Sequence, residues 1–243
     1  MIPTIKGSIL GASLLLVAAT AASAATLAVD INGGGTIVTE TGFTGYTATV
    51  AGALQTTFAY TDTSNGTDVT FTVTGLNGDN NRERGAIADN GVFTYGDLYR
   101  DILFDNATGG ADAFDITFSG LVANAAYSFK FYAFDNNQSD GHTNTFTLNT
   151  AGATFNAIFI DTSGATGGTG VITDAGTPTT NSQYALTLAG TTNNLGNISF
   201  TQTGSAYPVL NGFEITPVPE PSSAMALVSS IALLLGIRRR RTA

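Results

Sequence analysis

Two neighbouring stretches of the sequence alternate strictly between apolar and polar residues. The first, AFDITFS at residues 113–119, has Phe, Ile and Phe at positions 114, 116 and 118. The second, AYSFKFY at residues 126–132, places Tyr127, Phe129 and Phe131 between Ser128, Lys130 and Tyr132. Because successive side chains of a strand point to opposite faces, each stretch predicts a strand with one apolar and one wetter face. Gly120 and Leu121 end the first strand, and residues 124–126 turn the chain back.

The rest of residues 25–216 shows no sustained helical periodicity. Short runs of Thr, Val, Ile, Phe and Tyr recur between clusters of Gly, Asn and Asp, which is typical of many short strands joined by turns. Further strands are expected at 27–31, 47–50, 55–61, 68–74, 99–104, 143–149, 154–161, 184–188, 197–201 and 209–216. This pattern predicts an all-β fold with a single β-sandwich or jelly-roll domain over residues 25–216. A β-solenoid is the main alternative, but no constant repeat length supports it.

The first 24 residues have the pattern of a secretory signal peptide. Lys6 precedes an apolar run at residues 9–19, and Ala22-Ser23-Ala24 provides small residues for cleavage. The apolar run is too short to span a bilayer, so we expect residues 1–24 to be removed and the mature chain to begin near Ala25.

Charge and cysteine content exclude several classes of function for residues 25–216. Four cations stand against seventeen acidic residues there, a net charge of −13, which would repel nucleic acid and anionic lipid surfaces. The chain has no cysteine, which excludes disulfides, zinc–thiolate sites and cysteine nucleophiles.

The C-terminal segment, residues 217–243, has three parts in a fixed order. Val218-Pro219-Glu220-Pro221-Ser222 comes first, then an uncharged apolar run that predicts a transmembrane helix at 223–237, then Arg238, Arg239, Arg240 and Arg241. A helix over residues 222–237 would rise only about 24 Å, against a hydrocarbon core of about 30 Å. The arginines fix the orientation of the helix with the tail on the cytoplasmic side.

In order, spacing and position, these residues closely resemble the PEP-CTERM sorting signal of exported bacterial proteins. The resemblance implies that an exosortase, a membrane enzyme, recognises the tail and removes it near the Pro-Glu-Pro motif. Glu220 is then a recognition residue of a substrate, and the two prolines keep it extended and accessible. The resemblance also implies a protein of the cell envelope, outer surface or extracellular matrix, anchored in the membrane only transiently, in a host that makes exopolysaccharide.

The middle of the chain has a weaker resemblance to galactose-binding-like and malectin-like jelly rolls. It rests on GDLYRDILFD, then FDITFSGLVANAAYSFKFYAFD, then the closing YPVLNGFEIT. These segments follow the order of elements in those folds. Since such folds serve many roles, the resemblance implies architecture rather than activity.

Catalytic chemistry finds little support in the sequence. His142 is the only histidine and lies in an Asn/Asp/Gly-rich connection, and no Gly-x-Ser-x-Gly elbow is present. A glycosidase needs a pair of carboxylates, which spacing alone does not exclude, but only Glu40, Glu83 and Glu214 offer glutamates in the domain.

A calcium site is predicted in the loop DNNQSDG. Asp135, Asn137, Ser139 and Asp140 could direct alternate oxygens at a hard cation, although the loop departs from the EF-hand pattern. The alternative is a solvated loop whose Asn and Asp residues form their own turns. No other cofactor is indicated.

Sugar binding is a further hypothesis, based on Tyr95, Tyr99 and Tyr132. Tyrosines on strands are more often core or cross-strand partners, and the usual stacking residue, Trp, is absent. We expect Arg100 and Asp101 to form a buried pair at a strand end, and the charged segment 77–85 to be a solvated loop.

The sequence therefore predicts a noncatalytic exported protein of the cell surface or matrix, with an exosortase-type enzyme as its processing partner. A carbohydrate-binding module for exopolysaccharide or other glycans is the first alternative. A glycan-active enzyme is the second.

Overall fold

The computed structural model describes residues 25–35, 37–48, 54–60, 68–76, 81–105, 113–137, 142–149, 154–155, 169–174, 176–205 and 207–218. The chain divides into a unit at residues 24–220 and a second one made of residues 1–23 and 221–243, which lies outside the described residues. The predicted signal peptide, the sorting motif from Pro219 onward, the predicted transmembrane helix and the arginine tail all lie outside the described residues.

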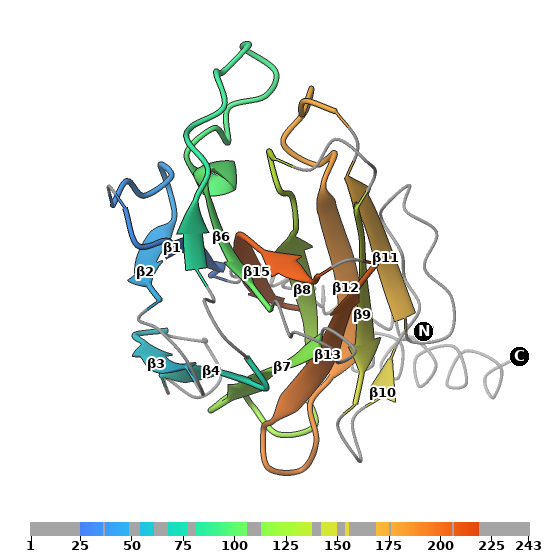
Figure 1. Cartoon of the computed structure of the whole chain (residues 1–243). Helices are drawn as coiled ribbons and strands as arrows, with labels where there is room; N and C mark the ends of the chain where they lie inside the picture. The colour runs from blue at the N-terminus through green and yellow to red at the C-terminus, as the bar shows by residue number, and fades with distance from the viewer. Residues whose placement is uncertain are drawn as a thin grey trace, which may run out of the picture. The chain divides into compact units, whose positions relative to one another are not determined.

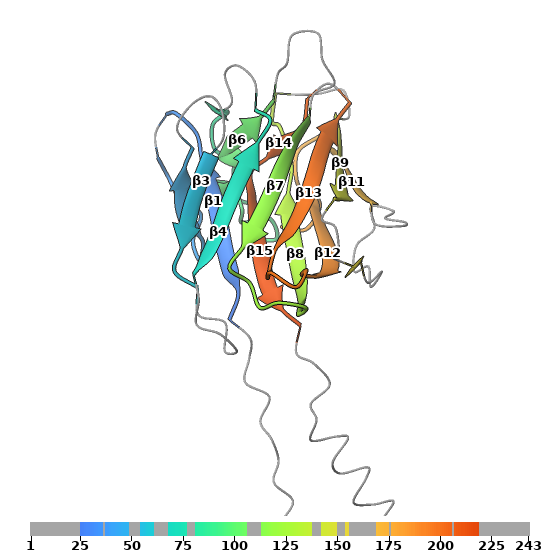
Figure 2. The ribbon, with the colours of Figure 1, turned by 90° about the horizontal axis from the view of Figure 1, so that it is seen from below.

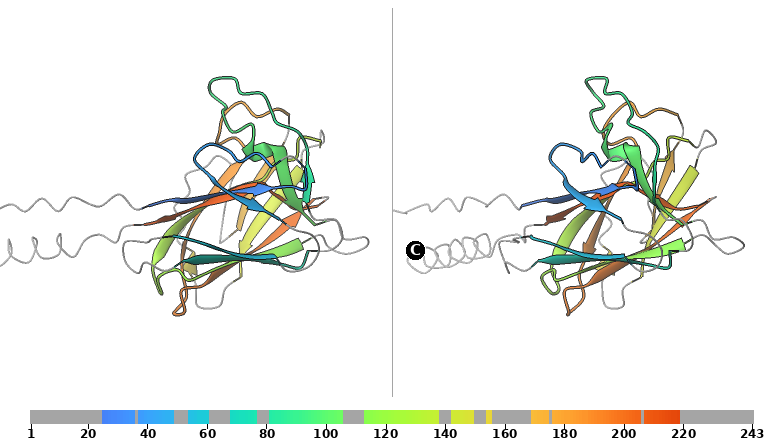
Figure 3. Two further views of the ribbon diagram at one scale, coloured as in Figure 1. Left: turned by 90° about the vertical axis from the view of Figure 1, so that its left-hand side faces the viewer. Right: turned by 60° about the vertical axis from the view of Figure 1, so that its left-hand side comes forward.

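The described residues form an all-β, sandwich-like fold with two six-stranded sheets (Figures 1 and 2). The side views of Figure 3 show the two sheets facing one another. Sheet A has the strand order β10-β12-β8-β15-β1-β2 and sheet B the order β11-β9-β13-β7-β4-β3. A third, smaller sheet, sheet C, has the order β14-β6-β5. All pairs are antiparallel except β1 with β2.

The strands have the following bounds. Sheet A contains β1 (Leu27–Asn32), β2 (Thr44–Thr47), β8 (Ala126–Tyr132), β10 (Thr154–Phe155), β12 (Ala185–Thr191) and β15 (Gly212–Pro217). Sheet B contains β3 (Leu54–Phe58), β4 (Val69–Thr74), β7 (Ala113–Ser119), β9 (His142–Leu148), β11 (Thr169–Asp174) and β13 (Ile198–Gly204). Sheet C contains β5 (Asn81–Glu83), β6 (Asp101–Phe104) and β14 (Val209–Leu210), and a 3₁₀ turn, η1 (Leu98–Arg100), precedes β6.

The two alternating stretches of the sequence form strands of different sheets. β7 pairs with β4 and β13, whereas β8 pairs with β12 and β15. Asn124, at φ 56°, lies in the connection between them, in a conformation that asparagine tolerates better than most residues. The chain therefore crosses from one layer to the other, and the apolar faces of β7 and β8 meet across the core.

Aromatic side chains fill the space between sheets A and B. The ring of Phe118 on β7 lies 5.5 Å from that of Phe129 on β8 and 4.9 Å from that of Phe213 on β15. Phe131 stacks on Phe146 of β9 with ring centroids 4.7 Å apart. All five side chains are at most 1% exposed. Each such burial contributes about 1.5–3 kcal/mol, so this layer is the main apolar contribution to the fold.

The predicted strands are confirmed for most of the described residues, with five differences. The strand expected over 209–216 is two strands, β14 in sheet C and β15 in sheet A, which are separated by Asn211. Residues 98–100 form η1 rather than the start of a strand at 99, and β2 ends at Thr47, where a strand over 47–50 was expected. Strands β5 and β11 were not predicted, because NRE carries no apolar residue and TGVITD begins within a long Gly/Thr-rich stretch.

Candidate functional site

The outer face of sheet A is covered at one end by η1 and the loop that carries Glu40. Asp30 and Asn32 on β1 project to this outer face, because Val29 and Ile31 occupy the alternate positions toward the core. Asp30 is 0% and Asn32 1% exposed. Asp30 and Asn32 would face solvent in an uncovered sheet. Here they are buried between sheet A and the segment that leads into sheet C.

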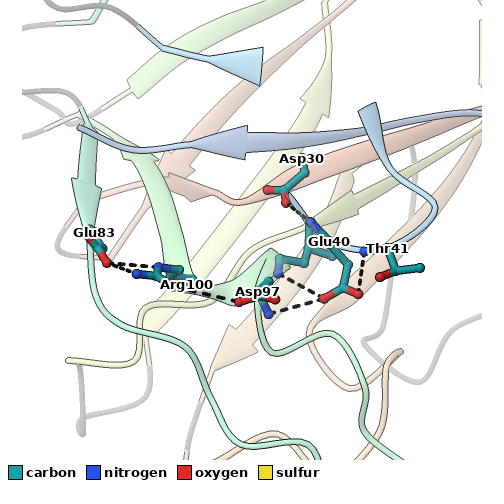
Figure 4. A network of polar contacts seen from close by, with 7 residues as sticks. Asp30, Glu40, Thr41, Glu83, Asp97 and Arg100 are labelled. Carbon is teal, nitrogen blue, oxygen red and sulfur yellow. Dashed lines mark hydrogen bonds and ion pairs between the residues drawn. The ribbon is translucent and has the colours of Figure 1, made fainter. Parts of the chain in front are cut away.

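A network of polar contacts fills this region (Figure 4). The amide of Glu40 donates to Asp30 Oδ2 at 2.7 Å. The Glu40 carboxylate in turn accepts hydrogen bonds from the amide of Thr41 at 2.9 Å and from the amides of Asp97 and Leu98 at 3.3 and 3.4 Å. Glu40 thus joins the loop after β1 to the start of η1.

Asp101 begins β6 at the same place and is 1% exposed. The amide of Gly33 faces its carboxylate and lowers its pKa, but the geometry falls short of a hydrogen bond. The expected pair with Arg100 is wrong: the Arg100 guanidinium contacts Glu83 instead, with Nε to Oε1 at 2.9 Å, and reaches Asp97 at 4.0 Å.

The two buried aspartates carry strongly perturbed pKa values. Burial raises the pKa of Asp30 to about 7, with the negative charges of Asp101, Glu40 and Asp97 adding to the effect and the Glu40 amide opposing it. Burial raises the pKa of Asp101 to about 6, and the charge of Glu83 adds to the increase. Glu40 shifts in the same direction, again mainly through burial. The region therefore concentrates negative charge where water does not stabilise it.

The predicted calcium loop is described only in part. Ser139 and Asp140 lie outside the described residues. Asp135 is fully buried, and its Oδ2 accepts from Arg84 Nη2 at 2.8 Å and from Tyr207 Oη at 2.9 Å. Its Oδ1 accepts from the amide of Asn137 at 2.9 Å. The carboxylate expected to bind calcium is thus already neutralised by an arginine.

The charged segment 77–85, expected to be a solvated loop, has a structural role in its described part. Residues 81–83 pair with β6, and the Arg84 side chain is only 8% exposed because it binds Asp135. The prediction was wrong for residues 81–83, which form a strand, and for Arg84, which its distant acidic partner buries, whereas the Arg82 side chain is exposed as expected.

The three candidate sugar-binding tyrosines lie together on the outer face of sheet A, in an aromatic cluster that includes Phe43. Ring centroids are 5.8 Å apart for Tyr95 and Tyr132 and 6.1 Å apart for Tyr99 and Tyr132. Tyr99 and Tyr132 are 0% exposed, so neither can stack on a sugar. The interpretation as packing partners is correct for these two, whereas Tyr95 and Phe43 remain partly exposed.

The outer face of sheet B has a different character. Its outward positions on β4, β7, β9 and β13 are occupied by Thr70, Thr72, Thr74, Ala113, Asp115, Thr117, Ser119, Thr143, Thr145, Thr147, Ser199, Thr201 and Thr203. Cross-strand register sets Thr72 beside Thr117 and Thr117 beside Ser199. Asp115 is the one charged residue among these positions, and its Oδ1 accepts from Thr201 Oγ1 at 2.6 Å.

His142 lies at one end of sheet B. It begins β9 opposite Asp174 of β11, so it lies in a strand rather than in the connection where the sequence placed it. Among the described residues, no group of three or more His, Cys, Asp or Glu side chains is arranged to hold one metal ion. The part of the chain described here contains no helix that is long and apolar enough to cross a membrane.

Comparisons with known proteins add little to this picture. No family model matches the chain, and no curated protein matches it. Among solved structures, the P-domain of Macrobrachium rosenbergii nodavirus matches 50% of this chain and 94% of its own length, at 12% identity and a TM-score of 0.31. A likeness of this degree carries no argument about fold family or function.

Proposed function

We propose that this protein is a noncatalytic, exported protein of the cell surface or extracellular matrix, delivered through a PEP-CTERM-type signal and cut by an exosortase-type enzyme. The observation that supports the proposal is where the folded domain ends. The Val218 amide donates to the Ala126 carbonyl at 2.9 Å, and the Val218 side chain is 42% exposed. Every described strand thus precedes Pro219, so a cut within Val218–Ser222 would leave all the described strands in one piece.

The start of the domain supports export in the same way. β1 begins at Leu27, three residues after the predicted signal cleavage site, and pairs there with Ile215 of β15. The beginning of the first strand and the end of the last are therefore neighbours in sheet A (Figure 2). Ala25 and Val218, the described residues next to the two proposed processing sites, therefore flank the same end of this sheet. We also propose that the sandwich is a jelly roll, in keeping with the order GDLYRDILFD to YPVLNGFEIT.

The sorting proposal is tested by mass and location of a tagged chain in its host. Wild type should lose the tail and reach the cell surface or medium. Glu220→Ala, or deletion of the sorting enzyme, should leave an uncut, membrane-retained chain. Ser223→Ala, just outside the motif, is the matched control and should behave as wild type. Equal mature mass and equal location in all of these strains would overturn the proposal.

A second candidate function is binding of a neutral polysaccharide, and the outer face of sheet B favours it. The face presents Thr and Ser on four adjacent strands with a single carboxylate, although residues 25–216 carry a net charge of −13. Such a face offers hydroxyl groups, which donate and accept hydrogen bonds, and methyl groups to a neutral polysaccharide, and it does not repel that polymer. An acidic polysaccharide would be repelled by the net negative charge of the domain.

Pull-down on insoluble neutral and acidic polysaccharides separates this function from a purely structural role. We expect retention on the neutral polymer, and loss of that retention in Thr117→Lys, which places a cation at the centre of the face. Ser128→Lys adds the same cation to the outer face of sheet A and should bind as wild type. Retention that is unaffected by Thr117→Lys would exclude this face.

A further inference from the structure

Three buried side chains at the junction of β1 and β6 hold oxygens that no described donor satisfies. They are Asp30 Oδ1, Asn32 Oδ1 and both carboxylate oxygens of Asp101. The exposed fractions of the three residues are 0%, 1% and 1%. A buried acceptor without a donor costs about 1–3 kcal/mol, and more if charged, so four such atoms in one region need a cause.

The Asp101 carboxylate lies next to the end of β1, close enough for its charge to act on Asp30. Asp30 and Asn32 are two residues apart and share a face of the strand. Asp101 Oδ1 lies 2.8 Å from the point that a Cβ of Gly33 would occupy, directly after Asn32. Gly33 thus leaves room for a carboxylate that a larger residue would displace.

No described cation forms an ion pair with Asp30 or Asp101, although the charge of Arg100 acts on Asp101 from the neighbouring position and lowers its pKa. Arg100 itself is engaged with Glu83 and Asp97. Glu40 is held by three backbone amides and adds negative charge. Figure 4 shows the contact between Asp30 and Glu40 and those of Arg100 with Glu83 and Asp97. Buried carboxylates without a cation are strongly destabilising, which favours an external one.

We propose that Asp30, Asn32 and Asp101 bind a calcium ion that ties sheet A to sheet C. The donor set is two carboxylates and one amide oxygen, the hard oxygen ligands that calcium takes, with backbone carbonyls or water completing its six to eight ligands. Without nitrogen or sulfur donors the set does not suit zinc. The site is separate from the loop around Asp135, whose carboxylate is occupied by Arg84.

The ion would act on the fold rather than on a reaction. β1 and η1 are joined through Asp30 and Glu40, and β6 is joined to the closing segment through Asn211, whose Nδ2 donates to the Asp101 carbonyl at 2.8 Å. A cation between Asp30 and Asp101 fixes the first strand, the segment 84–100 and the last strands to one another. Calcium binding therefore stabilises the folded domain by mass action.

The experiment uses the purified full chain in mild detergent, stripped with EGTA and then titrated with calcium chloride or terbium chloride. We expect one strong site by calorimetry, tyrosine-sensitised terbium emission, and a rise of several degrees in melting temperature. Magnesium at equal concentration should not substitute, because it requires a tighter octahedral shell.

Isosteric variants locate the site. Asp30→Asn and Asp101→Asn should each weaken calcium binding at least about tenfold, since ligand charge sets affinity. In EGTA the melting temperature of both variants should be no lower than that of wild type, because each substitution removes an unpaired buried charge. The same measurement shows that the variants fold. Asp68→Asn, an exposed aspartate at the start of β4, and Asp140→Asn in the alternative loop should bind calcium as wild type.

Two results would overturn the proposal. The first is the absence of heat, emission and melting shift in wild type, which would indicate that Asp30 and Asp101 share a proton instead. The second is calcium binding that survives both Asp30→Asn and Asp101→Asn, or that is lost in Asp140→Asn, which would place the ion in the loop.

Discussion

The Arg84 guanidinium and the Asp135 carboxylate form a buried ion pair, with Nη2 and Oδ2 at 2.8 Å and side chains 8% and 0% exposed. The pair joins the segment after β5 to the residues that follow β8, 51 positions apart in the chain. Tyr207 adds a hydrogen bond from the segment before β14. Three parts of the domain therefore meet at one carboxylate.

Removing the cation of this pair should be costly. Arg84→Ala leaves Asp135 charged and buried, and we expect the free energy of unfolding to fall by about 3–5 kcal/mol. Urea denaturation measures the change. Arg82→Ala removes a neighbouring, more exposed cation that lies over the Phe104 ring and should cost about 1 kcal/mol or less. Adding Asp135→Asn to Arg84→Ala should recover part of the loss, and no recovery would show that the pair's charge is unimportant.

The core should depend strongly on Phe118. Its ring contacts aromatic rings of both sheets, among them Phe71, Phe129 and Phe213. Phe118→Ala should destabilise the domain by about 3–5 kcal/mol through lost burial and a residual cavity. Ser119→Ala, the next residue on the outer face, should change stability by no more than about 0.5 kcal/mol. Similar midpoints for the two variants would contradict the placement of β7 against sheet A.

The residues that face the apolar core could be predicted from the sequence. This is because the alternation of apolar and polar residues depends only on near neighbours in the chain. Phe118 and Phe129 were placed on the inner faces of their strands from the spacing of their neighbours alone. The pairing partners were not evident, since β7 and β8 follow one another in the chain but belong to different sheets. Sheet membership depends on contacts between distant segments, which no short pattern encodes.

The buried polar sites could not be predicted for the same reason. The alternation of apolar and polar residues assigns Asp30 and Tyr132 to the solvent-facing side of their strands. Both side chains do lie on the outer face of sheet A, but residues from η1 and the loop of Glu40 cover them. Arg84 lies in a sequence typical of a solvated loop and is buried by Asp135. One local signal was available: Asp30 and Asn32 directly precede three glycines, an arrangement that permits close approach of another segment.

Two glycines with the same backbone conformation should respond differently to a methyl group. Gly120, at φ 85°, ends β7, and a Cβ there would lie 2.3 Å from the Asp68 carbonyl oxygen. Gly42, at φ 90°, has no atom within 4 Å of its Cβ position. Gly42→Ala should cost about 1–2 kcal/mol from the left-handed conformation alone. Gly120→Ala should cost clearly more, and thermal melting of the two variants gives the comparison. Equal losses would mean that the Asp68 carbonyl moves aside freely.

Tyr132 and Glu214 offer a test of the outer face of sheet A. The Tyr132 hydroxyl donates to Glu214 Oε1, and Lys130 Nζ lies 3.6 Å from the same oxygen. Burial, followed by the negative charge of Glu214, raises the pKa of Tyr132 far above its usual range. The folded chain should therefore keep this phenol protonated at a pH where exposed tyrosines ionise, and ultraviolet titration detects it within the tyrosine absorbance change that appears only on unfolding. Tyr132→Phe should reduce that delayed change by one tyrosine and cost about 1.5–3 kcal/mol, the range for a hydrogen bond to a charged group. Tyr46→Phe removes a hydroxyl for which the described residues show no hydrogen bond, so it should change stability by less than about 0.5 kcal/mol.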